Sequence, residues 1–420
     1  MPQSRQIPKE TGMDHSVALM SEGYLFIPNR CRRFQSDIFE TRLLGGQKVI
    51  CMSGAEAAEI FYDNQKFQRK GATPKAVQKT LFGVNAIQSM DGERHKHRKQ
   101  LFMSLMTPDR IHALQNIAEE QWEYAIKEWL TMPEVNLFEE ARQIMCRTAC
   151  QWSGVPLRAN ELKQRSSDLA AMVDAFGAAG PRHFRGRQAR KRSERWIKGI
   201  VEEVRAGVRE PAEGTALYEF SWYRDLDGNL LDSHMAGVEI LNILRPIVAI
   251  AYFIVFGAMA LHSYPDTKDK LVEDDGTYHK MFVQEVRRFY PFAPFTGARV
   301  KNDFTWRNHQ FTKGTLVLLD IYGTNHHNEI WDQPNRFMPE RFKDWNGSPF
   351  NFIPQGGGEF EIGHRCAGEW VTIDLMQISM EVLTQKIEYQ VPPQDFSIPM
   401  DRMPTIPMSR MLLTDVERKV

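Results

Sequence analysis

The sequence predicts a mainly α-helical protein with small β elements, built as a single domain over residues 1–420. Apolar residues at helical spacing recur in segment after segment, whereas strand signals are sparse. Apolar residues make up 42% of the chain and charged residues 25%, which is typical of a globular protein with a large core. Neither an internal repeat nor a Gly/Ser-rich linker divides the chain. We therefore expect one helix-rich domain.

Helical periodicity predicts most of the secondary structure. The expected helices, in chain order, cover Ala55–Asn64, Arg110–Leu130, Leu137–Trp152, Glu161–Phe176, Arg190–Arg205, Ser233–Leu261, Lys280–Phe289 and Ala367–Leu383. Strands are expected at Phe39–Leu44 and Lys48–Met52, where Gly45 and Gly46 favour a hairpin turn. Thr315–Ile321 is a β-rich apolar run, and a further strand is expected near Met411–Leu413.

Charge and composition exclude several classes of function. Lysine plus arginine equals aspartate plus glutamate at 53 each, so no overall field favours nucleic acid. The arginine-rich stretch Pro181–Lys198 lacks a nucleic-acid motif, and we interpret it as a solvated helix face, with steering of anionic substrates as the alternative. The five cysteines form no CxxC pair, which argues against a disulfide framework.

No membrane span is expected. The longest apolar stretch, Ile247–Leu261, is shorter than the roughly 20 residues that a span needs and favours a buried core helix. The first residues are polar and lack the apolar region of a secretory signal, so we expect a cytoplasmic protein.

Cys366 is the candidate metal ligand. Three consecutive glycines, Gly356 to Gly358, precede it in the segment FIPQGGGEFEIGHRCAGE, and they allow backbone to lie against a flat ligand. A helical pattern follows from Ala367, and a helix N-terminus favours a thiolate. A thiolate suits haem iron. The alternative is a free core cysteine beside a flexible loop.

Two further motifs favour Cys366 as a haem ligand over a free core cysteine. Glu285 and Arg288 lie one helical turn apart in an ExxR pair, and Arg341 follows in the segment PERF. In the order ExxR, PERF and glycine-rich cysteine loop, the chain resembles the cytochromes P-450, the haem-thiolate superfamily. That resemblance implies the helix-rich P-450 fold, with haem b buried between a distal and a proximal helix. It also implies Cys366 as the axial iron ligand and Glu285, Arg288 and Arg341 as a buried structural triad.

Other haem contacts are implied by the same resemblance. The segment DGERHKHRK is similar to the helix that binds the haem propionates, so His95 and Lys99 are expected to pair with them. A solvated basic helix is the alternative. Gly358 and Arg365, in the cysteine loop itself, complete the expected cofactor contacts.

The cysteine loop departs from the usual pattern of the superfamily, because the interval from Phe352 to Cys366 is several residues longer. The form GGGEFEIGHRCAGE, together with EVRRFYPFAPF, LFGVNAIQ and NILRPIVAI, resembles the bacterial fatty-acid peroxygenases. Matching segments run from about Phe67 to the C-terminus. This resemblance implies a long-chain fatty acid as substrate, hydrogen peroxide as co-substrate and no requirement for a redox partner.

Arg245 and Pro246 are the candidate catalytic residues of the helix Ser233–Leu261. Most P-450 monooxygenases place an acid and a threonine or serine there, and this helix lacks that pair. Pro246 cannot donate to the carbonyl of Asn242, so we expect the helix to open locally. Arg245 has apolar neighbours and needs an anion, because burying an unpaired cation is costly. A substrate carboxylate meets that need, and a distant carboxylate or a haem propionate is the alternative.

The expected reaction is hydroxylation of the fatty acid at its α and/or β carbon. Arg245 would hold the carboxylate, which would act as the general acid–base, beside the nearest carbons. At the position of Gln88, the family's alkene-forming decarboxylases carry histidine, so Gln88 favours hydroxylation. The alternatives are decarboxylation to terminal alkenes, a monooxygenase driven by a redox partner, and a non-catalytic haem sensor. The alkyl tail is expected among Leu81, Phe82, Val173, Phe176, Phe292 and Phe295.

Overall fold

Long helices carry most of the chain in the computed structural model, which describes residues 7–273 and 276–419. The long helices are α5 (Gly92–Ser104), α6 (Pro108–Trp129), α7 (Leu137–Ser153), α8 (Leu162–Asp174), α9 (Gly180–Arg205), α11 (Ser233–Ser263), α13 (Thr277–Phe289) and α15 (Glu369–Glu381). The shorter helices are α1 (Ser16–Glu22), α2 (Phe26–Phe34), α3 (Ala55–Phe61), α4 (Lys75–Val77), α10 (Ala216–Trp222), α12 (Pro265–Val272) and α14 (Ile321–Asn325).

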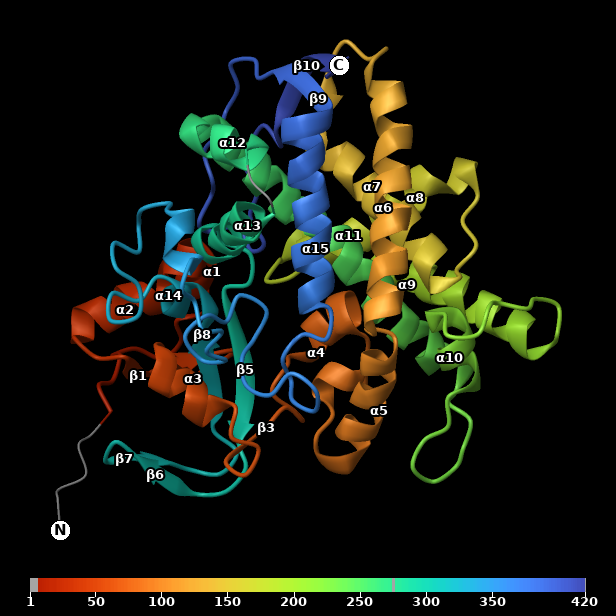
Figure 1. Ribbon diagram of the computed structural model, residues 1–420. Coiled ribbons are helices and arrows are strands. Elements are labelled where there is room, and N and C mark those ends of the chain that lie inside the picture. The colour runs from red at the N-terminus through yellow and green to blue at the C-terminus, as the bar shows by residue number, and fades with distance from the viewer. Residues whose placement is uncertain (1–6, 274–275, 420) are drawn as a thin grey trace.

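The β structure forms small sheets. The largest has the order β1-β2-β8-β5-β3, in which only β2 and β8 run parallel. Its strands are β1 (Ile38–Leu43), β2 (Gln47–Met52), β3 (Phe67–Gln68), β5 (Phe295–Val300) and β8 (Leu316–Asp320). A second sheet joins β4 (Val135–Asn136), β10 (Leu412–Arg418) and β9 (Ile387–Gln390), and a hairpin joins β6 (Phe304–Trp306) and β7 (His309–Phe311). Figure 1 shows the large sheet on one side of the molecule and the long helices on the other.

α11 is the central helix of the helical half. It packs against α7, α9 and α15 and is buried along nearly its whole length. It is long and apolar enough to span a membrane, but 89% of its most apolar window is buried inside the protein. A helix enclosed by its own chain on every side is a core helix, as expected from the sequence.

The expected helices and strands are present, with shifted ends. α9 begins ten residues earlier than expected, at Gly180, and the expected strand near Met411–Leu413 extends to Arg418 in β10. The arginine-rich face of α9 is only partly solvated, because Arg190 is buried, bonds Glu194 and donates to the carbonyl of Leu81.

The expectation that Pro246 opens its helix is wrong. α11 continues without a break from Ser233 to Ser263 with Pro246 inside it. Packing of the flanking residues against neighbouring helices outweighs the hydrogen bond that proline removes.

Candidate active site

A cavity of about 430 Å³ lies between the middle of α11 and the loop that leads into α15. It brings together the expected haem contacts His95, Lys99, Arg365 and Cys366, the candidate catalytic residues Gln88, Arg245 and Pro246, and the expected tail contacts Leu81, Phe82, Val173, Phe176, Phe292 and Phe295. These residues come from segments far apart in the sequence. Most of the wall is apolar, as a site for a lipid or a haem requires.

Cys366 is held in the loop by both its backbone and its side chain. Its amide N–H donates to the carbonyl of Gln355 at 3.1 Å, and its Sγ lies 3.8 Å from the side-chain Nε2 of Gln355. α15 begins three residues later, at Glu369, so the cysteine precedes a helix N-terminus as expected. Burial nevertheless raises the pKa of the Cys366 thiol, although the N–H of Gly368 and the charge of Lys99 act the other way. A metal cation bound to this sulfur would stabilise its thiolate form.

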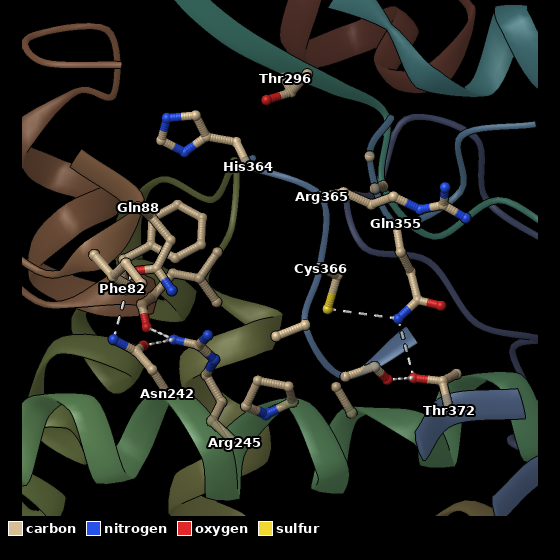
Figure 2. Close-up of a pocket in the computed structure, with 18 of the residues that line it drawn as sticks. Phe82, Gln88, Asn242, Arg245, Thr296, Gln355, His364, Arg365, Cys366 and Thr372 are labelled. Carbon is tan, nitrogen blue, oxygen red and sulfur yellow. Dashed lines mark hydrogen bonds between the residues drawn. The ribbon is translucent and has the colours of Figure 1, made fainter. Parts of the chain in front are cut away.

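Gln355 is fixed in orientation by its neighbours. Its Oε1 accepts from Nε and Nη2 of Arg287, at 3.1 and 2.7 Å. Its Nε2 therefore points toward Cys366 and also donates to Thr372 at 3.0 Å, as Figure 2 shows. Arg287 is itself buried and pairs with Glu369 at 2.7 Å. The polar side chains beside the sulfur therefore form one network of hydrogen bonds.

The glycines of the loop serve mainly to let the chain pack. Gly358 has φ +79°, and a Cβ there would lie 3.0 Å from the Cβ of Tyr62. A Cβ on Gly357 would lie 2.5 Å from the carbonyl oxygen of Pro349. Gly356, Gly363 and Gly368 line the cavity, whereas Gly358 does not. Gly358 packs against Tyr62 instead, and its expected contact with the cofactor stays a prediction.

Basic side chains gather at one part of the cavity wall. His95 and His364 stack with ring centroids 4.0 Å apart, and Lys99 Nζ donates to the carbonyl of Arg365 at 2.5 Å. Burial and the nearby His364 lower the pKa of His95 to about 3, so its ring is neutral at pH 7. Arg365 also bonds Glu369 through its guanidinium at 2.6 Å.

Arg69 joins this basic group, although no motif in its local sequence indicates a site. It lines the cavity, is buried, donates to the carbonyl of Gly297 at 3.1 Å and stacks over Phe61 at 4.4 Å. Within the described residues it makes no salt bridge. A buried cation without an acidic partner is suited to an anionic group of a ligand.

Arg245 is another buried cation of the cavity wall, carried by α11. Its side chain is buried, and within residues 7–273 and 276–419 no carboxylate pairs with it. Its guanidinium donates to the carbonyl of Leu81 and, at 3.1 Å, to Oδ1 of Asn242, and it lies 5.6 Å from the centre of the Phe82 ring. Burial and the nearby Arg190 lower the pKa of Arg245 to about 9, so it remains charged at pH 7. The charge faces an apolar cavity.

Gln88 lies in the cavity wall close to Arg245. Its Oε1 accepts from Nδ2 of Asn242, with a separation of 3.4 Å. The same Asn242 binds Arg245, so one amide joins the two expected catalytic side chains (Figure 2). The role of the Asn242 side chain could not be predicted, because nothing in a single sequence shows where an amide side chain points.

The expected structural triad is present, outside the cavity. Glu285 is fully buried and bonds Arg288 through both carboxylate oxygens at 2.7 Å. Arg341 approaches the same carboxylate at 3.1 Å. The three residues join α13 to the PERF segment.

Comparisons with known proteins agree with this geometry. A family model for cytochrome P-450 matches residues 274–414. Among solved structures, wild-type cytochrome P-450 EX alpha with myristic acid is 49% identical, with a TM-score of 0.95 over 98% of this chain and 99% of that one. Ligand-free cytochrome P-450 OleT is 37% identical, with a TM-score of 0.96 over 99% of each chain. Beta-amyrin 28-monooxygenase of Barbarea vulgaris is 22% identical over 94% of this chain and 90% of its own length.

The chain therefore belongs to the cytochrome P-450 family, within the bacterial fatty-acid peroxygenase branch that its motifs resemble. The family implies haem, and the residues present fit it. A half-buried cysteine in the cavity wall could offer its sulfur to the iron, and Arg69, His95 and Lys99 could offer N–H donors to the two propionates. Neither Arg69 nor Lys99 forms a salt bridge within the described residues, and a dianionic ligand would pair with them.

Proposed function

We propose that this protein uses hydrogen peroxide to hydroxylate long-chain fatty acids at the α and/or β carbon. One oxygen atom of the peroxide is inserted into a C–H bond, and the other leaves as water. The observation that carries the proposal is the buried, carboxylate-free guanidinium of Arg245 in an apolar cavity that also contains Cys366. Support comes from related structures solved with myristic acid and with arachidonic acid.

Cys366, with propionate contacts from Arg69, His95 and Lys99, would hold haem, which would supply activation of the peroxide O–O bond. Arg245 binds the substrate carboxylate and thereby keeps the α and β carbons nearest to the reacting centre. The bound carboxylate moves the proton that the acid–threonine pair moves in other members of the family. The side-chain amide of Gln88 holds water or peroxide by hydrogen bonding and transfers no proton itself.

The alkyl tail occupies the apolar part of the cavity. Phe292 contacts the rings of Tyr252 and Phe253, and Phe176 packs against Phe295 at a centroid distance of 6.3 Å. Leu81, Phe82 and Val173 complete this wall. We propose these residues as tail contacts, with the headgroup at Arg245.

The test is incubation of the purified holoprotein with a saturated fatty acid and hydrogen peroxide, followed by mass spectrometry of the products. We expect 2- and 3-hydroxy acids without any reductase. Terminal alkenes as the main product would instead establish decarboxylation, with one carbon lost as carbon dioxide. A strict requirement for a redox partner would establish the conventional monooxygenase.

Arg245→Ala tests the headgroup contact. Each hydrogen bond to a charged group contributes roughly 1.5–3 kcal/mol, so loss of a bidentate pair should lower kcat/KM at least about 100-fold. Arg195→Ala is the matched control, because Arg195 is an exposed arginine of α9 outside the cavity. Equal turnover by Arg245→Ala and wild type would refute the role.

We also propose that residues 1–420 act as one cytoplasmic domain. Limited proteolysis of the holoprotein should give no stable fragment smaller than the chain if a single domain is correct.

A further inference from the structure

Glu239 is a buried carboxylate of α11 that the proposed mechanism does not use. Its side chain is fully buried and accepts three hydrogen bonds from three different segments. The donors are the amide N–H of Ile87 at 3.0 Å, Nη1 of Arg98 in α5 at 3.0 Å and Nδ2 of Asn242 at 2.9 Å. Burying a carboxylate costs stability unless it is paired and hydrogen-bonded, so Glu239 needs these three donors in place. Arg98 supplies the balancing charge.

The contact from Glu239 fixes the orientation of the Asn242 amide. A carboxylate can only accept and a guanidinium can only donate. The Nδ2 of Asn242 must therefore face Glu239, and its Oδ1 must face Arg245, which donates to it at 3.1 Å. Without Glu239, the donor Arg245 would be the one fixed group that orients this amide, because the side-chain amide of Gln88 can itself turn over.

The contact from Ile87 fixes the segment that carries Gln88. Ile87 precedes Gln88 directly, and its N–H is held by Oε1 of Glu239. Gln88 also bonds Asn242 at 3.4 Å. One carboxylate thus anchors both cavity groups that would meet a substrate headgroup, Arg245 through Asn242 and Gln88 through the backbone of Ile87.

We infer that Glu239 is a positioning residue for substrate recognition: it holds Arg245 and Gln88 in the arrangement that selects an ionised carboxylate over an uncharged headgroup. This inference rests on the proposed function, because it assumes that a carboxylate binds Arg245. It adds that selectivity for the headgroup depends on a residue that never touches the substrate.

The experiment measures the dissociation constants of myristic acid and of 1-tetradecanol, which has the same chain length, by calorimetry on the holoprotein. Wild type should prefer the acid. Glu239→Gln should bind the alcohol within about twofold of wild type and the acid at least about tenfold more weakly, which corresponds to about 1.4 kcal/mol. The ratio of 2-hydroxy to 3-hydroxy product should also change, because the headgroup is no longer pinned in one place.

Two further variants separate positioning from stability. Glu10→Gln is the matched control: Glu10 is also buried, bonds Arg30, Arg33 and Thr41, and lies outside the cavity wall. It should lower stability without changing the preference for the acid. Asn242→Leu combined with Glu239→Gln should weaken acid binding no more than Asn242→Leu alone does, if Glu239 acts mainly through Asn242.

If Glu239→Gln fails to fold or to bind haem, Glu239→Asp tests the positioning role in its place. It keeps the charge opposite Arg98 but is one methylene shorter, so it should also lose much of the acid preference. Retention of the wild-type preference and product ratio by the folded variants would overturn the inference. A wild-type protein with no preference for the acid would instead refute the proposed function.

Discussion

Asp320 is a single residue whose titration should be visible in the stability of the protein. It is the N-cap of α14, where Oδ1 accepts from the N–H of Gly323 at 2.7 Å, and it is almost completely buried. Burial raises its pKa from 3.8 to about 7. The folded protein therefore holds a proton on Asp320 at pH values where the unfolded chain has lost it.

The sign of the pH effect follows from that shift. The contribution of Asp320 to the free energy of unfolding is fully present below pH 4. It is lost as the pH rises through 7, and the free energy of unfolding falls by up to about 4 kcal/mol from this group. Asp320→Asn keeps the capping oxygen and cannot titrate. The free energy of unfolding, measured by urea denaturation from pH 4 to 8, should decline less steeply in the variant. Parallel curves for the two proteins would contradict the assignment.

At this scale the sequence predicts residues with rare chemistry and misses those defined by their neighbours. Cys366 and Arg245 were predictable because a cysteine in a glycine-rich loop and an arginine in an apolar run are unusual. Arg69 and Gln355 are ordinary in their local sequence and become important only through the residues that tertiary packing brings near them. Gly358 packs against Tyr62, a neighbour that its local sequence does not indicate.

The cysteine loop is an element with no room for an added methyl group at Gly357. A Cβ on Gly357 would meet the carbonyl oxygen of Pro349 at 2.5 Å, Cγ2 of Ile353 at 2.9 Å and the Tyr62 ring at 3.0 Å. The first of these atoms is backbone and cannot rotate away. The loop must therefore shift if a methyl group is added, and Cys366 lies in the same loop.

Gly357→Ala should destabilise the protein by about 1–3 kcal/mol and reduce its haem content. Gly199→Ala is the matched control, since a Cβ there meets nothing within 4 Å and the residue lies within α9. Alanine at Gly199 should be neutral or stabilise the helix by up to about 1 kcal/mol. Thermal unfolding and the haem-to-protein ratio check both variants, and a full haem complement in Gly357→Ala would contradict the expectation.

Among elements, the sequence predicts those with a local signal. The helices were predicted from their periodicity, and the hairpin β1–β2 from its glycine turn. β3, with two residues, carries no local signal, because it is defined only by its pairing with β5 more than two hundred residues away. The error at Pro246 has the same origin: local propensity favours a break, and the surrounding helices determine the outcome.

At the scale of the whole molecule, the Glu285 cluster joins parts of the chain that are distant in sequence. Glu285 bonds Arg288 and Arg341 and also accepts from the N–H of Met338 at 2.8 Å. Arg288 donates in addition to the carbonyls of Asn325 and Pro334. Loss of one charge would leave two buried guanidinium groups without their anion.

Glu285→Gln should therefore lower the free energy of unfolding by roughly 3–5 kcal/mol. Glu340→Gln is the control, because Glu340 is exposed and its bond to Lys270 is a surface pair worth at most about 1 kcal/mol. Urea denaturation followed by circular dichroism measures both. Similar effects of the two substitutions would show that the cluster does not hold the fold together.

The guanidinium of Arg245, which pairs with no carboxylate in the described residues, should affect how stable and how abundant the protein is in the cell. If the carboxylate of a bound fatty acid balances the charge of Arg245, the complex is more stable than the free protein. The free energy of unfolding is then higher by about 2.7 kcal/mol at a ligand concentration one hundred times its Kd. Heat tolerance should then rise with added myristic acid and much less with 1-tetradecanol. A chain deprived of lipid opens more often and meets proteases more often, so its abundance should follow the supply of free fatty acid.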